Sequence, residues 1–379
     1  MSLLEMFSAR YPMARTTFLG ALKSAGGTHL AAHENPRKGP AGEALYADIA
    51  RIGPDDAKRL LILVSGTHGI EGYSGSGCHA AWLASGLFAR QAGADTAVLF
   101  VHAINPFGFA WGRRTNEDNV DLNRNFVDHA KPRPANADYE AIAEHVDPVD
   151  WGDAAARAKH NAAIAKFLGR ETHDVMSKAM HGGQYVNPKG TFYGGTAPTW
   201  SNRIFRAAVA EHAARAEQVA IIDYHTGGGL FGFVDFFVDD DRDGVTGRDG
   251  LSGAAKSRHW FSHATVIAED KARYGKDAQS ETPGNLFYAV PEIVPGKRYT
   301  LGLVELRTGE AKTGIDAIRA ENWLFHHGDI DSPEGAARAD AIRAEVRERF
   351  YPASEVWRAM VLRQSHALIG EALAGLAKA

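Results

Sequence analysis

The residues of this sequence best able to do chemistry are two histidines and two glutamates that follow or interrupt short apolar runs. His68 and Glu71 lie three positions apart in a Gly-rich stretch, His225 lies in the sequence DYHTG, and Glu305 lies inside an apolar run. An imidazole and a carboxylate three residues apart on a turn can face one zinc ion. A second imidazole would leave a fourth position open for water, as a catalytic zinc requires. These residues are therefore candidates for a metal site.

Each of these features also has an ordinary structural interpretation. A His-x-x-Glu spacing arises by chance, so His68 and Glu71 could be a surface pair that follows a strand. His225 could simply cap a strand. Glu305 could form an ion pair with Arg307, or it could be a general base whose pKa is raised by burial. Taken singly, none of the four positions decides between structure and catalysis.

A third polar group lies between these positions in the chain. It consists of NPFGF at 105–109, the pair Arg113 and Arg114, and DLNRNF at 121–126. Guanidinium groups can bind a carboxylate through two parallel hydrogen bonds and can stabilise a developing oxyanion. Arg-rich loops usually belong to solvated surface, but the apolar residues within DLNRNF indicate a loop that is pinned on both sides. The segment is a candidate anion receptor.

The candidates are spaced along a pattern of short apolar runs that alternate with helical stretches. Runs of about five to seven residues, rich in β-branched side chains, are typical of buried parallel strands. We therefore predict an α/β fold with a single mixed, mostly parallel central sheet flanked by helices in three layers. In such sheets ligands bind beyond the carboxyl ends of the strands. The predicted strands are 60–65, 97–103, 219–223, 233–238, 264–268 and 300–306, and the predicted helices are about 75–90, 154–180, 202–216, 310–325, 334–350 and 354–377.

The motifs together resemble the zinc metallocarboxypeptidases of the carboxypeptidase A type, including their aspartoacylase and succinylglutamate desuccinylase relatives. That family has H-x-x-E after a strand, then N-P-x-G-F, an arginine, D-x-N-R-N-F, a later histidine in D-x-H-T/S, and a glutamate in E-L-R. This chain has every element in the same order, over roughly residues 60–325. Several short motifs in order are far more specific than any one of them. The chain resembles a divergent bacterial-type member with a zinc carboxypeptidase-like, phosphorylase/hydrolase-like fold.

The resemblance implies that zinc is the cofactor and that His68, Glu71 and His225 bind it. It implies that Glu305 is the general base that activates a water molecule, and that the reaction is hydrolysis of an amide bond next to a free carboxylate. Asp223, two residues before His225, could orient that histidine from behind. The chain is therefore expected to be a zinc metallohydrolase, either a metallocarboxypeptidase or an amidohydrolase.

The same resemblance implies roles for the arginine-rich segment. Asn123 and Arg124 would hold the terminal carboxylate of the substrate. Arg114 would stabilise the oxyanion, with Arg113 as the alternative if the loop is shifted by one residue.

The family also has a tyrosine, between the third zinc ligand and the glutamate, that closes on the substrate. Tyr288 and Tyr299 are the candidates here. Tyr299 resembles a structural tyrosine just before the last strand, so Tyr288 is the predicted catalytic residue.

The domain prediction is a catalytic domain over 1–329 and a C-terminal helical extension over 330–379 packed on it. Residues 128–202 are polar and punctuated by Pro and Gly, which indicates an insertion that shapes a cleft. A large insertion could restrict the site to small substrates. The expected substrate is a small peptide or, alternatively, an N-acyl amino acid. A non-catalytic ligand-binding member of the fold is less favoured, because neither the base nor a zinc ligand is lost.

Composition excludes several classes of function. The 42 Lys and Arg against 46 Asp and Glu give a net charge of −4, which provides no field for nucleic acid or an anionic membrane. Cys78 alone can form neither an internal disulfide nor a thiolate zinc cluster. Charged residues interrupt the N-terminus, so a secretory signal is not indicated, and no apolar run reaches the roughly 18–20 residues of a membrane span. We expect a cytoplasmic protein that binds no nucleic acid and no membrane, and no pattern predicts its oligomeric state.

Two competing motifs are weak. The sequence GGGLFG at 227–232 fits the dinucleotide pattern G-x-G-x-x-G, but a strand-like run follows it rather than a phosphate-capping helix. The sequence GYSGSG at 72–77 lacks the G-x-S-x-G register of serine hydrolases. The H-E-x-x-H motif of thermolysin-type enzymes is absent.

Overall fold

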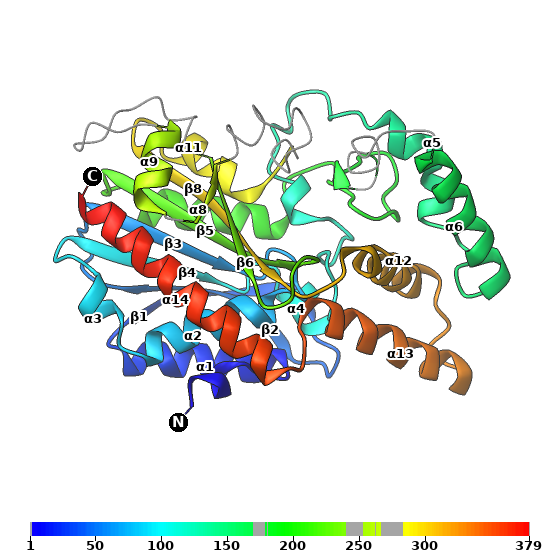
Figure 1. Cartoon of the computed structure of the whole chain (residues 1–379), viewed down its shortest axis with the longest axis horizontal. Helices are drawn as coiled ribbons and strands as arrows, with labels where there is room; N and C mark the ends of the chain where they lie inside the picture. The colour runs from blue at the N-terminus through cyan, green and yellow to red at the C-terminus, as the bar shows by residue number, and fades with distance from the viewer. Residues whose placement is uncertain are drawn as a thin grey trace.

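A single eight-stranded sheet with helices on both faces organises the protein in this computed structural model (Figure 1). The structure describes residues 2–169, 179, 181–239, 253–261, 263–266 and 283–378. The strand order is β1-β2-β4-β3-β5-β8-β6-β7. The strands are β1 (Thr28–Lys38), β2 (Ala44–Ile52), β3 (Arg59–Ser65), β4 (Thr96–His102), β5 (Gln218–Gly227), β6 (Val234–Asp239), β7 (Thr265–Val266) and β8 (Arg298–Arg307).

The four central strands β4, β3, β5 and β8 are parallel neighbours. They are almost fully buried because helices cover both faces, which explains their continuous apolar runs. β6 pairs antiparallel with β8, so the sheet is mixed. The predicted α/β class and mostly parallel sheet are confirmed. Of the predicted strand 264–268, the part beyond Val266 lies outside the described residues.

The N-terminal residues contribute more than the sequence indicated. They form helix α1 (Tyr11–Ser24) and the antiparallel pair β1 and β2, and β2 joins the sheet edge beside β4. β1 is a sheet-edge strand with mostly exposed side chains, so it lacks the apolar run that marks the other strands. Their place in the sheet had no clear signal in the sequence.

Two helical layers cover the sheet. Helices α1, α2 (Gly72–Ala84) and α14 (Glu355–Lys378) pack on one face, and their buried side chains belong to one core cluster. Helix α8 (Trp200–His212) and the short helices η5 (Leu286–Ala289) and α11 (Val290–Ile293) belong to the core cluster of the other face. α14 contacts the central strands directly, so the C-terminal helix is part of the sandwich itself.

Of the remaining helices described, α5, α6, α12 and α13 gather at one end of the sheet (Figure 1), and η1, α4 and α9 add side chains to the first core cluster. These remaining helices are η1 (Leu3–Met6), α3 (Phe88–Gln91), α4 (Pro106–Trp111), η2 (Leu122–Arg124), α5 (Ala137–Val146), α6 (Ala154–Leu168), α9 (Gly253–Trp260), α12 (Ala311–His327) and α13 (Pro333–Phe350). Of the predicted helix 154–180, the structure describes α6, and most of the rest lies outside the described residues. Among the helices described, none has the length and hydropathy needed to cross a membrane.

The strand order reverses at β3. The chain leaves β3 through α2 to reach β4 on one side, and it returns through α8 to β5 on the other side. The connections lie on opposite faces of the sheet, and ligands in open α/β sheets bind at such a reversal, beyond the carboxyl ends of the strands. Residues at the carboxyl ends of β3 and β5 therefore lie close together.

Candidate metal centre

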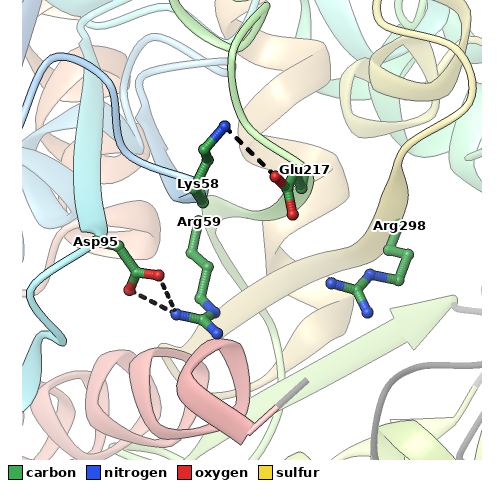
Figure 2. Close-up of a pocket in the computed structure, with 5 residues that line it drawn as sticks. All are labelled: Lys58, Arg59, Asp95, Glu217 and Arg298. Carbon is green, nitrogen blue, oxygen red and sulfur yellow. Dashed lines mark hydrogen bonds and ion pairs between the residues drawn. The ribbon is translucent and has the colours of Figure 1, made fainter.

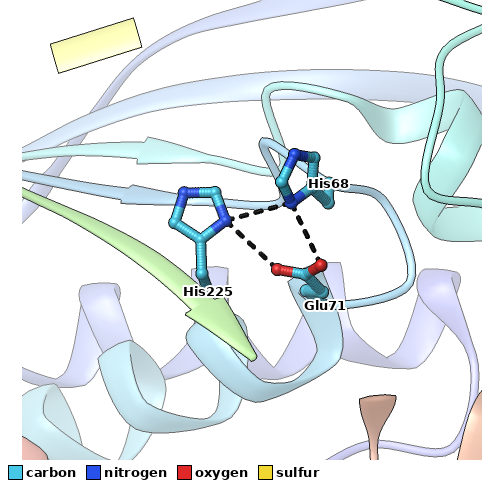
Figure 3. Close-up of side chains that lie close together, drawn as sticks. All are labelled: His68, Glu71 and His225. Atoms are coloured by element: carbon cyan, nitrogen blue, oxygen red, sulfur yellow. Dashed lines mark hydrogen bonds and ion pairs between the residues drawn. The ribbon is translucent and has the colours of Figure 1, made fainter. Parts of the chain in front are cut away.

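Three side chains converge at this end of the sheet, and they could hold a metal ion (Figure 3). His68 lies on the turn after β3, Glu71 precedes the first residue of α2, and His225 lies in β5. The two Nδ1 atoms of the histidines are 3.1 Å apart. The Glu71 carboxylate lies 3.0 Å from Nδ1 of His68 and 3.1 Å from Nδ1 of His225. All three residues are buried.

Glycines make the turn that carries His68 and Glu71. Gly66 has a φ of 75°, a left-handed conformation that favours glycine. A Cβ on Gly69 would lie 2.0 Å from the backbone of Gly108, so only glycine permits this close approach to α4. The NPFGF segment therefore serves as the surface against which the turn is shaped.

Each imidazole is oriented by a carboxylate on its far side. Nε2 of His68 lies 3.1 Å from Asp121, and Nε2 of His225 lies 2.7 Å from Asp223. Thr67 donates a hydrogen bond of 2.7 Å to the other oxygen of Asp223. With Nε2–H donated outward, each Nδ1 has its lone pair directed at the centre, which is the arrangement of metal-binding histidines. The expected orienting role of Asp223 matches its contact, whereas Asp121 was not singled out in the sequence.

The donor atoms fit a zinc ion. Zinc takes imidazole nitrogen and carboxylate oxygen at about 2.0–2.2 Å in tetrahedral geometry, which places neighbouring donors a little over 3 Å apart. The observed separations of 3.0–3.1 Å are close to that value. Three protein donors leave a position for water or substrate.

The charges around the centre favour a cation. Burial would raise the pKa of Glu71, but the imidazoles of His68 and His225 outweigh burial and hold that pKa well below its ordinary value. Burial would lower the pKa of His225, but Asp223 and Glu71 outweigh it and raise the pKa. The pKa of Asp121 likewise lies below its ordinary range, because nearby positive groups overcome burial. Buried carboxylates thus stabilise positive charge at this place.

Glu305 lies beside this centre on the neighbouring strand. It is the register partner of His225 in the parallel pair β5 and β8, so both side chains point to the same face of the sheet. Burial raises the pKa of Glu305. Its Oε2 is buried and has no hydrogen-bond partner among the described residues, and Arg307 stays 3.9 Å away because it pairs with Asp235 at 2.6 Å. A Cβ on Gly227 would lie 2.8 Å from Oε2, so this glycine provides space for the carboxylate.

The two adjacent arginines have different surroundings. Arg114 lies at the centre, with Nε 3.0 Å from Asp121 and Nη1 3.4 Å from Glu71. Arg113 is buried elsewhere: Nε lies 2.5 Å from Glu321 on α12, and its guanidinium stacks at 3.4 Å on the ring of Phe325. Arg113 thus forms a buried ion pair away from the centre, whereas its neighbour Arg114 faces the centre.

Asn123 and Arg124 lie beside the candidate metal ligands rather than among them. Nδ2 of Asn123 is 3.1 Å from Nε2 of His225, and its Oδ1 accepts a hydrogen bond from the backbone of Leu286 at 3.0 Å. The Arg124 guanidinium donates to the carbonyl oxygens of Asn123 at 2.9 Å and His181 at 2.5 Å, and its Nε has no partner among the described residues. Asn123 is therefore in contact with a candidate ligand as well as with the chain around it.

Two aromatic residues of the insertion lie beside Arg114 and Arg124, and nothing in the sequence indicated either. The buried ring of Phe192 lies 5.2 Å from the guanidinium carbon of Arg114 and 6.0 Å from that of Arg124. Phe192 has a φ of 56°, which is unusual for a residue with a large side chain. The Tyr185 hydroxyl donates to the carbonyl of Arg124 at 2.6 Å. Neither residue belongs to a motif, so only the fold reveals them.

Tyr288 and Tyr299 occupy different places. Tyr288 lies in η5, two residues after the Leu286 amide that binds Asn123, and its ring packs 4.3 Å from that of Phe287. Tyr299 is buried in β8, and its hydroxyl donates to the carbonyl of Val294. Tyr299 therefore contacts the chain just before β8.

A separate hollow lies at the opposite, amino-terminal edge of the sheet (Figure 2). Its volume is about 120 Å³, and five charged residues line it: Lys58, Arg59, Asp95, Glu217 and Arg298. Most of these charges pair with each other, as in Arg59 with Asp95 at 2.5 Å and Lys58 with Glu217 at 3.4 Å. The hollow has no contact with the metal centre.

Comparison with known proteins gives one family match and several structural ones. The family described as "Protein of unknown function (DUF2817)" matches residues 7–364. No curated protein matches the sequence.

Three of the solved structures that are similar to the chain are the following. Bovine thrombin-activatable fibrinolysis inhibitor, in complex with tick carboxypeptidase inhibitor, is 12% identical, with 96% of this chain and 100% of that chain covered and a TM-score of 0.46. Carboxypeptidase A from Helicoverpa armigera is 13% identical over 89% and 73% of the chains, with a TM-score of 0.42. A succinylglutamate desuccinylase from Silicibacter sp. is 17% identical over 80% and 66%, with a TM-score of 0.38.

Proposed function

The chain belongs to the family described as protein of unknown function (DUF2817), whose description names no reaction, so we propose a function from the residues of the metal centre. We propose a zinc-dependent hydrolase that cleaves an amide bond next to a free carboxylate. The observation that carries the proposal is the convergence of two Nδ1 atoms and a carboxylate at 3.0–3.1 Å, with each imidazole backed by a second carboxylate.

His68, Glu71 and His225 would hold the zinc ion. Zinc bound there would supply Lewis acidity toward the carbonyl and make a water molecule more acidic. Every other step belongs to side chains of the chain itself.

Glu305 is the proposed general base. Its raised pKa brings the carboxylate closer to the pKa of the groups with which it exchanges protons, which favours transfer. Its Oε2 has no hydrogen-bond partner among the described residues and lies on the same face as His225, so it would accept a proton from the attacking water. The water oxygen would bond to the carbonyl carbon, the carbon–nitrogen bond would break, and Glu305 would give its proton to the leaving nitrogen.

Arg114 is the proposed oxyanion donor. Its Nε and Nη1 are held by Asp121 and Glu71, which fixes the guanidinium beside the centre. Its Nη2 has no partner among the described residues and remains available to the oxygen that becomes negative. We assign this role to Arg114 alone, because Arg113 is committed to Glu321.

Arg124 is the proposed receptor for the substrate carboxylate. It is buried, and its Nε lacks a partner in the described part of the chain, so an anion would satisfy it. Asn123 would support it from the same turn. Tyr288 remains a proposed contact on the η5 side of Asn123.

An N-acyl amino acid is the second candidate substrate, and the surroundings of Arg124 favour it. A Cβ on Gly183 would lie 2.5 Å from the Arg124 side chain, and Tyr185 binds the Arg124 carbonyl. The insertion therefore packs closely over this arginine and favours a small group there.

Two variants test the mechanism. Glu305→Gln should abolish hydrolysis, by about 10²–10⁴-fold, and retain the metal, because the base touches no ligand atom. His68→Ala should lose the metal. Metal content by elemental analysis and turnover of C-terminal dipeptides and N-acyl amino acids measure both effects. Unchanged turnover in Glu305→Gln, or a fully metalated His68→Ala protein, would overturn the assignment.

A further inference from the structure

Two histidines of the insertion face each other away from the metal centre. His145 lies in α5 and His160 in α6, and these helices pack together at one end of the molecule (Figure 1). Their Nδ1 atoms are 3.0 Å apart, and their ring centroids are 5.3 Å apart. This contact repeats the Nδ1-to-Nδ1 approach of the buried pair.

The far side of the His160 ring again carries a carboxylate, because its Nε2 lies 3.0 Å from Asp150. Asp150 fixes the tautomer of His160 in which Nδ1 has a free lone pair. Glu144, 83% exposed and 3.7 Å from Nε2 of His145, is too far away for a hydrogen bond, so the His145 ring is free to turn its own Nδ1 lone pair to an ion. We propose that His145 and His160 form a second metal site, which takes a divalent first-row transition-metal ion such as Zn²⁺ or Cu²⁺.

The accessibility and chemistry of the pair define the ion. The side chains of His145 and His160 are 27% and 17% exposed, so an ion can reach them from solvent. Imidazole nitrogen suits zinc, copper and nickel, whereas calcium and magnesium require oxygen ligands. In the described part of the chain no third His, Cys, Asp or Glu joins the pair, so water completes the coordination. The site binds more weakly than a three-ligand centre.

Binding there would join α5 to α6. Arg319 of α12 already holds the end of α5, through hydrogen bonds of 2.7 Å to the carbonyl of His145 and 2.8 Å to that of Val146. It also binds Asn161, the neighbour of His160, at 2.8 Å. The ion adds a link between the same two helices, so it raises the thermal stability of the protein.

Calorimetric titration of the metal-free, full-length protein with Zn²⁺ tests the proposal. Two equivalents are expected, the second at least about tenfold weaker because it has two protein ligands rather than three. His160→Ala should lose the weaker equivalent and keep the tight one. His68→Ala should do the reverse. His212→Ala, the same change on α8, is the matched control and should retain both.

A second measurement does not depend on whether the alanine variant folds. It uses electron paramagnetic resonance of Cu²⁺ bound to the His68→Ala protein, which should show two nitrogen ligands. Adding His145→Gln, which removes the Nδ1 donor but keeps a side chain of similar polarity, should reduce the number of nitrogen ligands to one. A single Zn²⁺ equivalent in the unmodified chain would overturn the proposal, as would a weak equivalent that survives both substitutions; the two rings would then only hydrogen-bond to each other. Each site is removed by its own substitution. A negative result at His145 and His160 therefore does not contradict the proposed hydrolase, and a negative result at His68 does not contradict the second metal site.

Discussion

The two histidine pairs of this protein have nearly the same local geometry and very different surroundings. The Nδ1 atoms are 3.1 Å apart in His68 and His225 and 3.0 Å apart in His145 and His160. The buried pair has Glu71 as a third donor, whereas no described residue supplies a third donor to the insertion pair. The buried pair lies at the reversal point of the sheet, and the other lies between two consecutive surface helices. A third ligand and burial, rather than imidazole geometry, therefore separate the proposed hydrolytic centre from the proposed surface site.

The largest expected effect comes from removing that third ligand. Glu71→Gln should lower zinc affinity at the buried pair by at least about 10³-fold, more than the 10–100-fold that loss of an outer partner costs. Glutamine keeps an acceptor for the Thr226 amide, which donates to Glu71 at 3.0 Å, so the fold is retained. Competition with a coloured chelator measures the affinity, with Glu305→Gln as the control that keeps it. An affinity within tenfold of the original would show that two histidines suffice.

A buried histidine that belongs to neither pair should respond to protons rather than to metal. Burial lowers the pKa of His102 to about 4 from an ordinary 6.5, while Ser76 is 2.8 Å from its Nε2. The unfolded chain therefore takes up this proton first as the pH falls. The contribution of neutral His102 to the free energy of unfolding is fully present above about pH 6.5. It is lost as the pH falls to about 4, which lowers the free energy of unfolding by about 3 kcal/mol.

Urea unfolding at pH 7 and pH 5 measures this loss. His102→Gln should flatten the decline of stability between these values, and His327→Gln, on an exposed side chain, should leave it unchanged. Equal declines in both variants would mean that His102 is not the buried group that titrates.

Outer carboxylates should matter more at the buried pair. Asp223→Asn leaves the contact at Nε2 of His225 but removes the charge, and zinc affinity should fall about 10–100-fold. Asp150→Asn at the insertion pair should cost less, because Asp150 is 59% exposed and water screens its charge. Parallel zinc titrations compare the two, and an equal loss at both sites would remove the proposed role of burial.

The smallest effect is expected from the aromatic ring beside the arginines. Phe192→Leu keeps an apolar side chain but removes cation–π contacts with Arg114 and Arg124, worth about 0.5–2 kcal/mol. The ratio kcat/KM should fall by several-fold to about thirtyfold with metal content unchanged. Phe192→Tyr is the matched control and should retain most activity. A metal loss in Phe192→Leu would instead assign the ring to the centre itself.

The sequence predicted the central sheet well because burial on both faces produces continuous apolar runs. The runs that became β3, β4, β5 and β8 were recognised within a few residues. The hairpin β1 and β2 was missed, because β1 is an exposed edge strand and has no apolar run. The predicted ligands of the metal centre were spaced on motifs, and the structure brings all three together.

Other site features had no sequence signal. Arg113 and Arg114 are the same residue type at adjacent positions, so the sequence alone does not separate their roles. Only the contact of Arg113 with Glu321 and of Arg114 with Asp121 distinguishes them. Phe192 and Tyr185 come from the insertion, whose residues have no recognisable spacing.

The sequence by itself determined the chemistry available to this protein: the donors His68, Glu71 and His225, the base candidate Glu305, and the strands that carry them. Residue types and local spacing are enough for this, because a strand end fixes where its next few residues lie. The tertiary structure decided which donors meet, which arginine faces them, and that His145 and His160 form a second pair. These outcomes depend on contacts between residues distant in the chain, so no local pattern records them.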